Sequence, residues 1–306
     1  MEQERSSGCR MKQLKRELWL HLMFKPKPMP KHMLKIIYAT ILLIVISPGK
    51  SFADETFPVK DVAISTPPKS VYSISIPLDG AILGVTGLFG FSAETFDKNI
   101  ITRRCPCNPN EVNPFDRHVI GNANNFLDGV SDVTAVSAVI APALWSWYEL
   151  RTTTLFFEDM TVYAEVISVN TAMVSLAKLA AQRPLPRVYA DPNSDLAQQP
   201  GGFRSFYSGH TSTTFAALSA ASMTAYLRHG ASIWPWFITA AIGTSVGLER
   251  VAAGRHFYTD VIFGALSGTA VGTLIPLLHS KKFENPSLIT LTTVQGDPAL
   301  TWIKRF

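Results

Sequence analysis

Apolar residues gather in segments of helical length that are separated by polar, Pro-rich or Gly-rich stretches. One segment covers residues 72–91 and includes Pro77 and Asp79, and a polar stretch follows at 92–130. The later segments do not alternate apolar and polar residues with a period of two, so each is predicted to be a helix. They lie at about 131–148, 159–182, 209–228, 232–249 and 258–279. The pattern predicts an all-α fold, a bundle of about five to six helices.

Several of these segments run for 16 to 19 residues without a charged side chain, which is close to the minimum for crossing a bilayer. We therefore expect a membrane-embedded bundle, with a bundle inside a soluble exported domain as the alternative. Trp145, Trp147, Trp234 and Trp236 lie near segment ends, where they suit either a membrane interface or the core. Whether 72–91 crosses with the other segments is left open.

The first 53 residues have the features of an export leader. Basic residues at 31–35 precede an apolar run at 36–46, and Ser51-Phe52-Ala53 supplies a small-x-small cleavage site. This order predicts a secretory signal peptide at 33–53. Residues 1–32, which are basic and rich in Pro, are interpreted as an extension upstream of the true start codon.

The charge of the chain separates this leader from the rest. Residues 1–53 hold ten Lys and Arg against three Asp and Glu, and residues 54–306 hold eighteen against twenty, a net charge of −2. The basic charge is therefore a property of the leader and gives no reason to expect nucleic-acid binding. After the leader we expect an exported segment with one apolar helix and a polar loop at 54–130, a helical core at 131–280, and a tail with a short strand or hairpin at 281–306.

Near the C-terminus, Arg250, His256 and Asp260 bring together a cation, an imidazole and a carboxylate. His256 and Asp260 are four residues apart, so on a helix they would share a face. The carboxylate would then accept a hydrogen bond from one ring nitrogen and leave the other free to attack. Arg250 would hold an anionic group against the imidazole. The same spacing is common in structural positions, so this stretch alone does not decide for catalysis.

Two further stretches suit an anion. Ser208-Gly209-His210 opens the segment at 209–228, where a hydroxyl, free backbone N–H groups and a helix N-terminus would favour a phosphate. A plain Ser N-cap is the alternative. Lys178 and Arg183, at the end of the segment 159–182, would either add positive charge to the same group or only complement the helix dipole.

In this order the three stretches resemble the signature of the type 2 phosphatidic acid phosphatase superfamily, K-x6-R-P, then P-S-G-H, then S-R-x5-H-x3-D. This superfamily includes the lipid phosphate phosphatases and is related to the vanadium haloperoxidases. The third motif matches at Arg250, His256 and Asp260, with Glu249 in place of Ser. The second matches at 208–210, with one substitution before Ser208. The resemblance covers roughly residues 130 to 280.

The first motif departs most from the family pattern. Lys178 matches the motif Lys, but Leu185 stands where the family has Arg. Arg183 and Arg187 are the candidates to replace that missing guanidinium.

The resemblance implies a phosphohistidine mechanism that uses no metal. His256 would attack phosphorus, Asp260 would orient His256, and His210 would protonate the leaving oxygen and later activate water. The residues that the resemblance assigns to the phosphoryl oxygens are Lys178, Arg183, Ser208, Gly209 and Arg250. The substrate would be a phosphorylated lipid at a membrane surface, and no metal, other cofactor or protein partner is expected.

We therefore predict a metal-independent phosphoric monoester hydrolase that acts on a phosphate monoester or pyrophosphate of a lipid. Its predicted location is a bacterial-type inner membrane with an extracytoplasmic, periplasmic active site. If residue 54 is exported and the segment 72–91 does not cross the membrane, Arg228 and Lys281 lie in the cytoplasm, as the positive-inside rule prefers. The alternatives are a soluble periplasmic acid phosphatase, a vanadium haloperoxidase, and a non-catalytic phospholipid-binding envelope protein, for which Leu185 is the supporting feature.

The remaining polar and small residues are assigned structural roles. Asp116, Asp128 and Asp132 fit a solvated loop and the acidic first turn of a helix. Cys105 and Cys107 are interpreted as a loop constraint or a vicinal-type disulfide. The residues spaced for close helix packing are Gly243, Gly247, Gly264 and Gly268.

Overall fold

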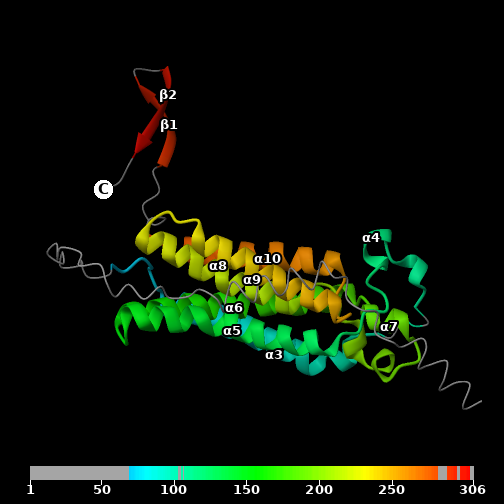
Figure 1. Ribbon diagram of the computed structural model, residues 1–306. Coiled ribbons are helices and arrows are strands. Elements are labelled where there is room, and N and C mark those ends of the chain that lie inside the picture. Colours follow the sequence, from blue (N-terminus) through cyan, green and yellow to red (C-terminus); the bar gives the residue numbers. More distant parts are fainter. Residues whose placement is uncertain (1–68, 103–104, 106, 282–287, 295–296, 304–306) are drawn as a thin grey trace, which may run out of the picture.

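The computed structural model (Figure 1) describes residues 69–102, 105, 107–281, 288–294 and 297–303, so the predicted leader and its cleavage site lie outside the described residues. Within them, long helices form one bundle, which confirms the predicted fold class. These helices are α3 (Ile76–Ile100), α5 (Asn125–Leu150), α6 (Thr154–Ala181), α8 (Gly209–His229), α9 (Trp234–Ala252) and α10 (Tyr258–Leu278).

Several helices extend beyond the segments that hydropathy outlines, α5 and α9 among them. α5 begins at Asn125 rather than 131, because the Asn124 side chain caps the helix by accepting a hydrogen bond from the Leu127 N–H. α9 continues to Ala252 rather than 249, and its last turn is buried. Both extensions lie at the same end of the bundle, and they carry charged side chains into it.

Hydrogen bonds between the helices show their directions. Thr86 of α3 pairs with Ser168 of α6 at 2.5 Å, and Thr102, just after α3, bonds Gln182, just after α6, so these two helices run in parallel. Asp159 at the start of α6 binds Arg228 at the end of α8, which makes that pair antiparallel. Overall, α3, α6 and α9 run one way, and α5, α8 and α10 run the other way.

We call the two ends of the bundle the site end and the far end. The site end holds the starts of α5, α8 and α10 and the short elements between the long helices (Figure 1). The far end holds residues 69–75, which contact the end of α10 through a hydrogen bond from the Lys281 N–H to the Val71 carbonyl. The short elements of the site end are η1 (Pro109–Glu111), α4 (Pro114–Arg117), α7 (Pro186–Ala190), η2 (Asp195–Gln198) and η3 (Pro200–Phe203).

Two smaller features agree with the sequence. In the tail, β1 (Leu288–Val294) pairs with β2 (Asp297–Ile303) in an antiparallel hairpin, as the alternation there predicts. Cys105 and Cys107 form a disulfide, and both pack beside buried apolar side chains of the site end. The interpretation of this pair as a disulfide is therefore confirmed.

Glycine lets α8 and α10 touch backbone to backbone. A Cβ atom on Gly268 would lie 2.1 Å from the Ser212 carbonyl oxygen, and one on Gly264 would lie 2.8 Å from the Ser208 carbonyl oxygen. No larger residue fits at this separation without moving one of the helices. The predicted packing role of these glycines is confirmed, and the contact holds Ser208 against the start of α10.

The bundle has the outer surface of a membrane protein. Four stretches are long and apolar enough to cross a bilayer: Ile76–Ala93, Asn125–Leu150, Thr154–Ala190 and Tyr258–Leu278. Large apolar side chains such as Leu88, Phe91, Val133 and Leu266 point outward and are exposed. Lipid tails would cover such a surface at no cost, whereas water would not. The helices therefore indicate that the protein is embedded in a membrane.

The position of α3 bears on the topology that the sequence leaves open. α3 lies along α6 and is one of the four candidate spans. If it crosses, residues 69–75 and the site end lie on opposite sides of the membrane. Export of residue 54 and an extracytoplasmic site are then mutually exclusive, so the predicted combination holds only if α3 does not cross.

Candidate active site

His256 lies at the site end, in the loop before α10. Because α10 begins at Tyr258, His256 is not helical, and the expectation that it shares a helical face with Asp260 is wrong. The imidazole is buried, and its Nδ1 lies 2.7 Å from the Ser205 carbonyl oxygen. A carbonyl only accepts hydrogen bonds, so Nδ1 carries the proton and Nε2 keeps its lone pair.

Asp260 is fully buried just behind this histidine, and three donors hold its carboxylate. They are the Ser205 hydroxyl at 2.5 Å, the Phe257 N–H at 2.9 Å and Arg183 Nη1 at 2.6 Å. Ser205 therefore joins Asp260 to His256, with its hydroxyl on the carboxylate and its carbonyl on the imidazole. Asp260 thus reaches His256 through Ser205, and its orienting role stays a prediction.

Arg183 occupies a different place from the one expected. Its guanidinium bridges Asp260 and Asp116, with Nη2 2.8 Å from Asp116 Oδ2, and it stacks over the Phe257 ring. Burial alone would raise the pKa of Asp116, but hydrogen bonds from Arg183 and Thr259 outweigh it and lower that pKa. Arg183 thus supports Asp260 from behind, whereas a direct phosphate contact was predicted.

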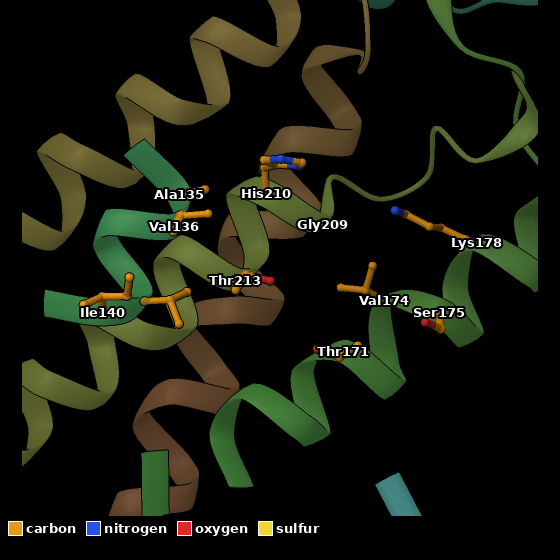
Figure 2. Close-up of a pocket in the computed structure, with 11 residues that line it drawn as sticks. Ala135, Val136, Ile140, Thr171, Val174, Ser175, Lys178, Gly209, His210 and Thr213 are labelled. Carbon is orange, nitrogen blue, oxygen red and sulfur yellow. The ribbon is translucent and has the colours of Figure 1, made fainter. Parts of the chain in front are cut away.

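The start of α8 forms the second wall of the site. Ser208 is buried, and its hydroxyl oxygen caps the helix by accepting from the Thr211 N–H and hydroxyl. The N–H groups of the first turn, including that of Gly209, have no partner within the helix and favour an anion. A Cβ atom on Gly209 would lie 3.4 Å from Lys178 Nζ. Figure 2 shows the Lys178 side chain reaching from α6 toward this helix start.

His210 and Arg250 share an acidic partner on α5. His210 Nε2 lies 2.8 Å from Asp132 Oδ1. Arg250 Nη1 donates to Asp128 at 2.8 Å and to Asp132 at 3.1 Å. The Nε–H of Arg250 is buried without a hydrogen-bond partner among the described residues.

The electrostatics show that the predicted residues converge. The pKa of His256 lies well below its ordinary value, first because of burial and then because of the nearby charges of Arg250 and Lys178. His210 acts on the same ring to a smaller extent. The imidazole of His256 is therefore neutral at pH 7, as a nitrogen nucleophile must be.

Sequence reasoning missed the acidic partners of this site. Asp128 lies in the acidic first turn of α5, as predicted, but it is only 13% exposed and binds Arg250 at 2.8 Å and Arg255 at 2.7 Å. Asp116 and Asp132 were set aside in the same way, and Ser205 was not considered. One signal was present: Arg250 follows an apolar segment, and a buried guanidinium requires a carboxylate from elsewhere in the chain.

The two candidates for the missing arginine of the first motif are both engaged elsewhere. Leu185 is buried and packs against Val188 and Ala197. Arg187 donates to the Ala253 carbonyl at 2.7 Å and to Asn125 at 3.0 Å, and Arg183 is engaged by two carboxylates. Position 185 has become part of an apolar cluster in this chain.

A cavity of about 390 Å³ opens beside the start of α8 and extends between α5, α6 and α8. Its polar end is formed by Lys178, Gly209 and His210, and Figure 2 shows the apolar side chains that continue from it. The remaining lining residues are Ala135, Val136, Val139, Ile140, Thr171, Val174, Ser175 and Thr213. The cavity therefore joins a positively charged head to an apolar channel that leads into the bundle.

Comparison with known proteins agrees with this geometry. The model of the PAP2 superfamily matches residues 159–284. A protein of Schizosaccharomyces pombe named "Probable diacylglycerol pyrophosphate phosphatase 1" is 30% identical over 171 residues, which cover 46% of this chain and 61% of that protein. The chain thus spans about three-fifths of the length of this curated relative. No solved structure matches the chain significantly.

Proposed function

Residues 159–284 belong to the PAP2 superfamily, the type 2 phosphatidic acid phosphatase family, and from this premise we propose that the protein hydrolyses a phosphate monoester or pyrophosphate of a membrane lipid. The observation that carries the proposal is the state of His256. Its Nδ1–H is bound to the Ser205 carbonyl, so Nε2 is an unprotonated nucleophile in a positively charged surrounding.

The reaction proceeds in two displacements at phosphorus. Nε2 of His256 forms a bond to phosphorus while the bond from phosphorus to the leaving oxygen breaks, and His210 gives that oxygen a proton. Water then attacks the phosphohistidine, His210 takes a proton from it, and phosphate leaves with the imidazole restored. Asp132 holds Nε2 of His210, so we assign the transferred proton to Nδ1.

The negative charge on the phosphoryl oxygens is stabilised by groups that surround the start of α8. Lys178 and the buried Nε–H of Arg250 supply positive charge. The Ser208 hydroxyl and the Gly209 N–H supply neutral donors at the helix N-terminus. Such preorganised donors stabilise the transition state for phosphoryl transfer. Arg183 acts indirectly in this scheme, by holding Asp260.

The cavity favours a lipid over a soluble ester. A phosphate bound at Lys178 and Gly209 would place its ester group at the mouth of a channel lined by Val136, Val139 and Ile140. An acyl chain gains free energy in such a channel, and a hydrophilic leaving group does not. The S. pombe relative is named for a lipid pyrophosphate, so diacylglycerol phosphates and pyrophosphates are the proposed substrate class.

We further propose that the site end faces the extracytoplasmic side. The disulfide between Cys105 and Cys107 lies at the site end, and disulfides persist in oxidising compartments. Arg228 and Lys281 lie at the far end, where the positive-inside rule places cations. With α3 crossing, residues 69–75 are then cytoplasmic, and this topology replaces the export of residue 54 and the cleaved signal peptide that the sequence predicts.

The test is phosphate release by the purified protein in detergent micelles with EDTA, at a temperature where it is folded. Wild type should release phosphate from a phosphorylated diacylglycerol, and His256→Ala should lose more than about a thousandfold in kcat. Val139→Trp fills the channel and should lower kcat/KM for long-chain substrates by about tenfold or more. Ala141→Trp, at an exposed position on another face of the same helix, is the matched control and should leave it unchanged.

Each alternative function predicts a different outcome of these assays. A preference for soluble esters that Val139→Trp does not change would identify a soluble-substrate acid phosphatase. Bromide oxidation that depends on added vanadate would identify a haloperoxidase. Absence of phosphate release by folded protein from any of these substrates would contradict the enzyme proposal and favour a phospholipid-binding role.

A further inference from the structure

Three ionisable side chains from three helices meet at the far end of the bundle. Asp79 lies in the first turn of α3, Glu165 lies within α6, and His279 follows the end of α10. Their candidate ligand atoms all lie within 4.8 Å of one another. His279 Nε2 is 3.2 Å from Glu165 Oε2 and 3.5 Å from Asp79 Oδ1.

Other contacts aim these atoms at a common point. His279 Nδ1–H donates to the Ile275 carbonyl at 2.9 Å, so the lone pair of Nε2 faces the two carboxylates. Asp79 Oδ2 accepts from the Ser75 N–H at 2.8 Å, which leaves Oδ1 toward His279. A histidine that donates its second N–H to a backbone carbonyl is the usual arrangement around protein-bound metals.

With both carboxylates ionised, the cluster carries more negative charge than the described side chains neutralise. Asp79 and Glu165 are 2% and 1% exposed, and Glu165 Oε1 is buried without a hydrogen-bond partner among the described residues. Even a protonated His279 would leave one negative charge uncompensated in the apolar bundle, which is costly. A divalent cation together with a neutral imidazole would balance both carboxylates.

The distances select the kind of cation. Zinc binds carboxylate oxygen and imidazole nitrogen at about 2.0–2.2 Å in tetrahedral sites, which puts neighbouring ligand atoms about 3.3–3.6 Å apart. The separations of 3.2 and 3.5 Å fit this spacing. Calcium takes six to eight oxygen ligands, and magnesium prefers an octahedron of oxygens. We propose that Asp79, Glu165 and His279 bind one divalent transition-metal ion, zinc above all.

The ion would join α3 to α6 and α10, and it would have no part in phosphoryl transfer. Glu165 precedes Lys178 by 13 residues on α6, which is about 20 Å along a helix. The proposed site therefore agrees with a phosphatase whose chemistry uses no metal, and it does not rest on the proposed function. The three ligands lie far apart in the sequence, so no motif reveals them.

The experiment uses the full-length protein in detergent, stripped with a chelator and then titrated with zinc chloride. After dialysis, wild type should retain about one zinc per chain, and its melting temperature should rise with zinc. His256→Ala should retain the same amount, which separates this site from the catalytic one. Glu165→Gln and His279→Gln should each bind zinc more than about 100-fold more weakly, while Asp195→Asn, an exposed carboxylate of the site end, should match wild type.

Cobalt provides a readout that does not require every variant to fold. Binding of cobalt(II) to stripped wild type should produce visible absorption bands of a tetrahedral site with nitrogen and oxygen ligands, and zinc should abolish them. Stripped, folded wild type that takes up neither metal would overturn the proposal. Equal zinc retention by His279→Gln would also overturn it. Phosphate release per folded molecule should be the same with and without zinc.

Discussion

Replacing Ser205 with alanine tests how Asp260 acts on His256. Ser205 is completely buried; its hydroxyl donates to Asp260 Oδ2 at 2.5 Å, and its carbonyl accepts from His256 Nδ1 at 2.7 Å. The substitution removes only the hydroxyl and keeps the carbonyl. It therefore breaks the link to the carboxylate and leaves the tautomer of His256 in place.

The size of the effect follows from the charge on the acceptor. A hydrogen bond to an ionised group contributes about 1.5–3 kcal/mol, and each 1.36 kcal/mol of transition-state stabilisation is about tenfold in rate. If the link serves to stabilise the imidazolium that forms as His256 attacks, kcat should fall by about 10- to 150-fold. KM should change little, because no part of this link contacts the proposed phosphate position.

Phosphate release at saturating lipid phosphate measures kcat, and rapid quenching measures the acid-labile phosphoenzyme. Ser146→Ala is the matched control, since Ser146 is also buried and donates to a buried carboxylate, Asp159, at 2.6 Å, but at the far end. Both variants should lose similar stability, and only Ser205→Ala should lose kcat. Wild-type kcat in Ser205→Ala, beside a large loss in Asp260→Asn, would refute the link through Ser205.

Two further predictions concern pH and topology. Because burial, Arg250 and Lys178 lower the pKa of His256, its nucleophilic neutral form persists into acid. The acid limb of kcat/KM, corrected for ionisation of the substrate, should therefore have its midpoint below about 6.5, and a midpoint at or above that value would contradict the assignment. With α3 crossing, a cysteine at Asp195 should react with an impermeant maleimide in intact cells. A cysteine at Lys69 should react only after permeabilisation. Both variants are made in a protein from which the three native cysteines have been removed. The reverse labelling pattern would place the site in the cytoplasm.

The helices could be predicted because burial in this chain follows long apolar segments. The segments at 209–228 and 258–279 correspond closely to α8 and α10, and Gly264 and Gly268 were expected to pack closely against another helix without indicating which one. The ends of the helices were predicted less accurately. The start of α5 depends on a single capping side chain, Asn124, which hydropathy does not detect.

The His256–Asp260 spacing shows why a correct motif gave a wrong geometry. Two residues that are four apart on one helix share a face, but the second of them can also lie in the first turn of a helix that begins after the other. Here Asp260 is the third residue of α10 and accepts the Phe257 N–H, so the carboxylate caps the helix and His256 remains outside it. Both arrangements have the same sequence, and only the contacts with Ser205 and Arg183 distinguish them.

Buried charges in this bundle find their partners on other helices, at sequence separations that no local pattern reveals. Arg250 binds Asp128 across 122 residues, and Arg228 binds Asp159 across 69. A charged residue at the end of an apolar segment thus predicts that a partner exists without identifying it. Asp79 and Glu165 break this balance, because His279 is the one cationic group that faces both among the described residues. The same rule that pairs Arg183, Arg250 and Arg255 with carboxylates at the site end therefore favours the proposed cation at the far end.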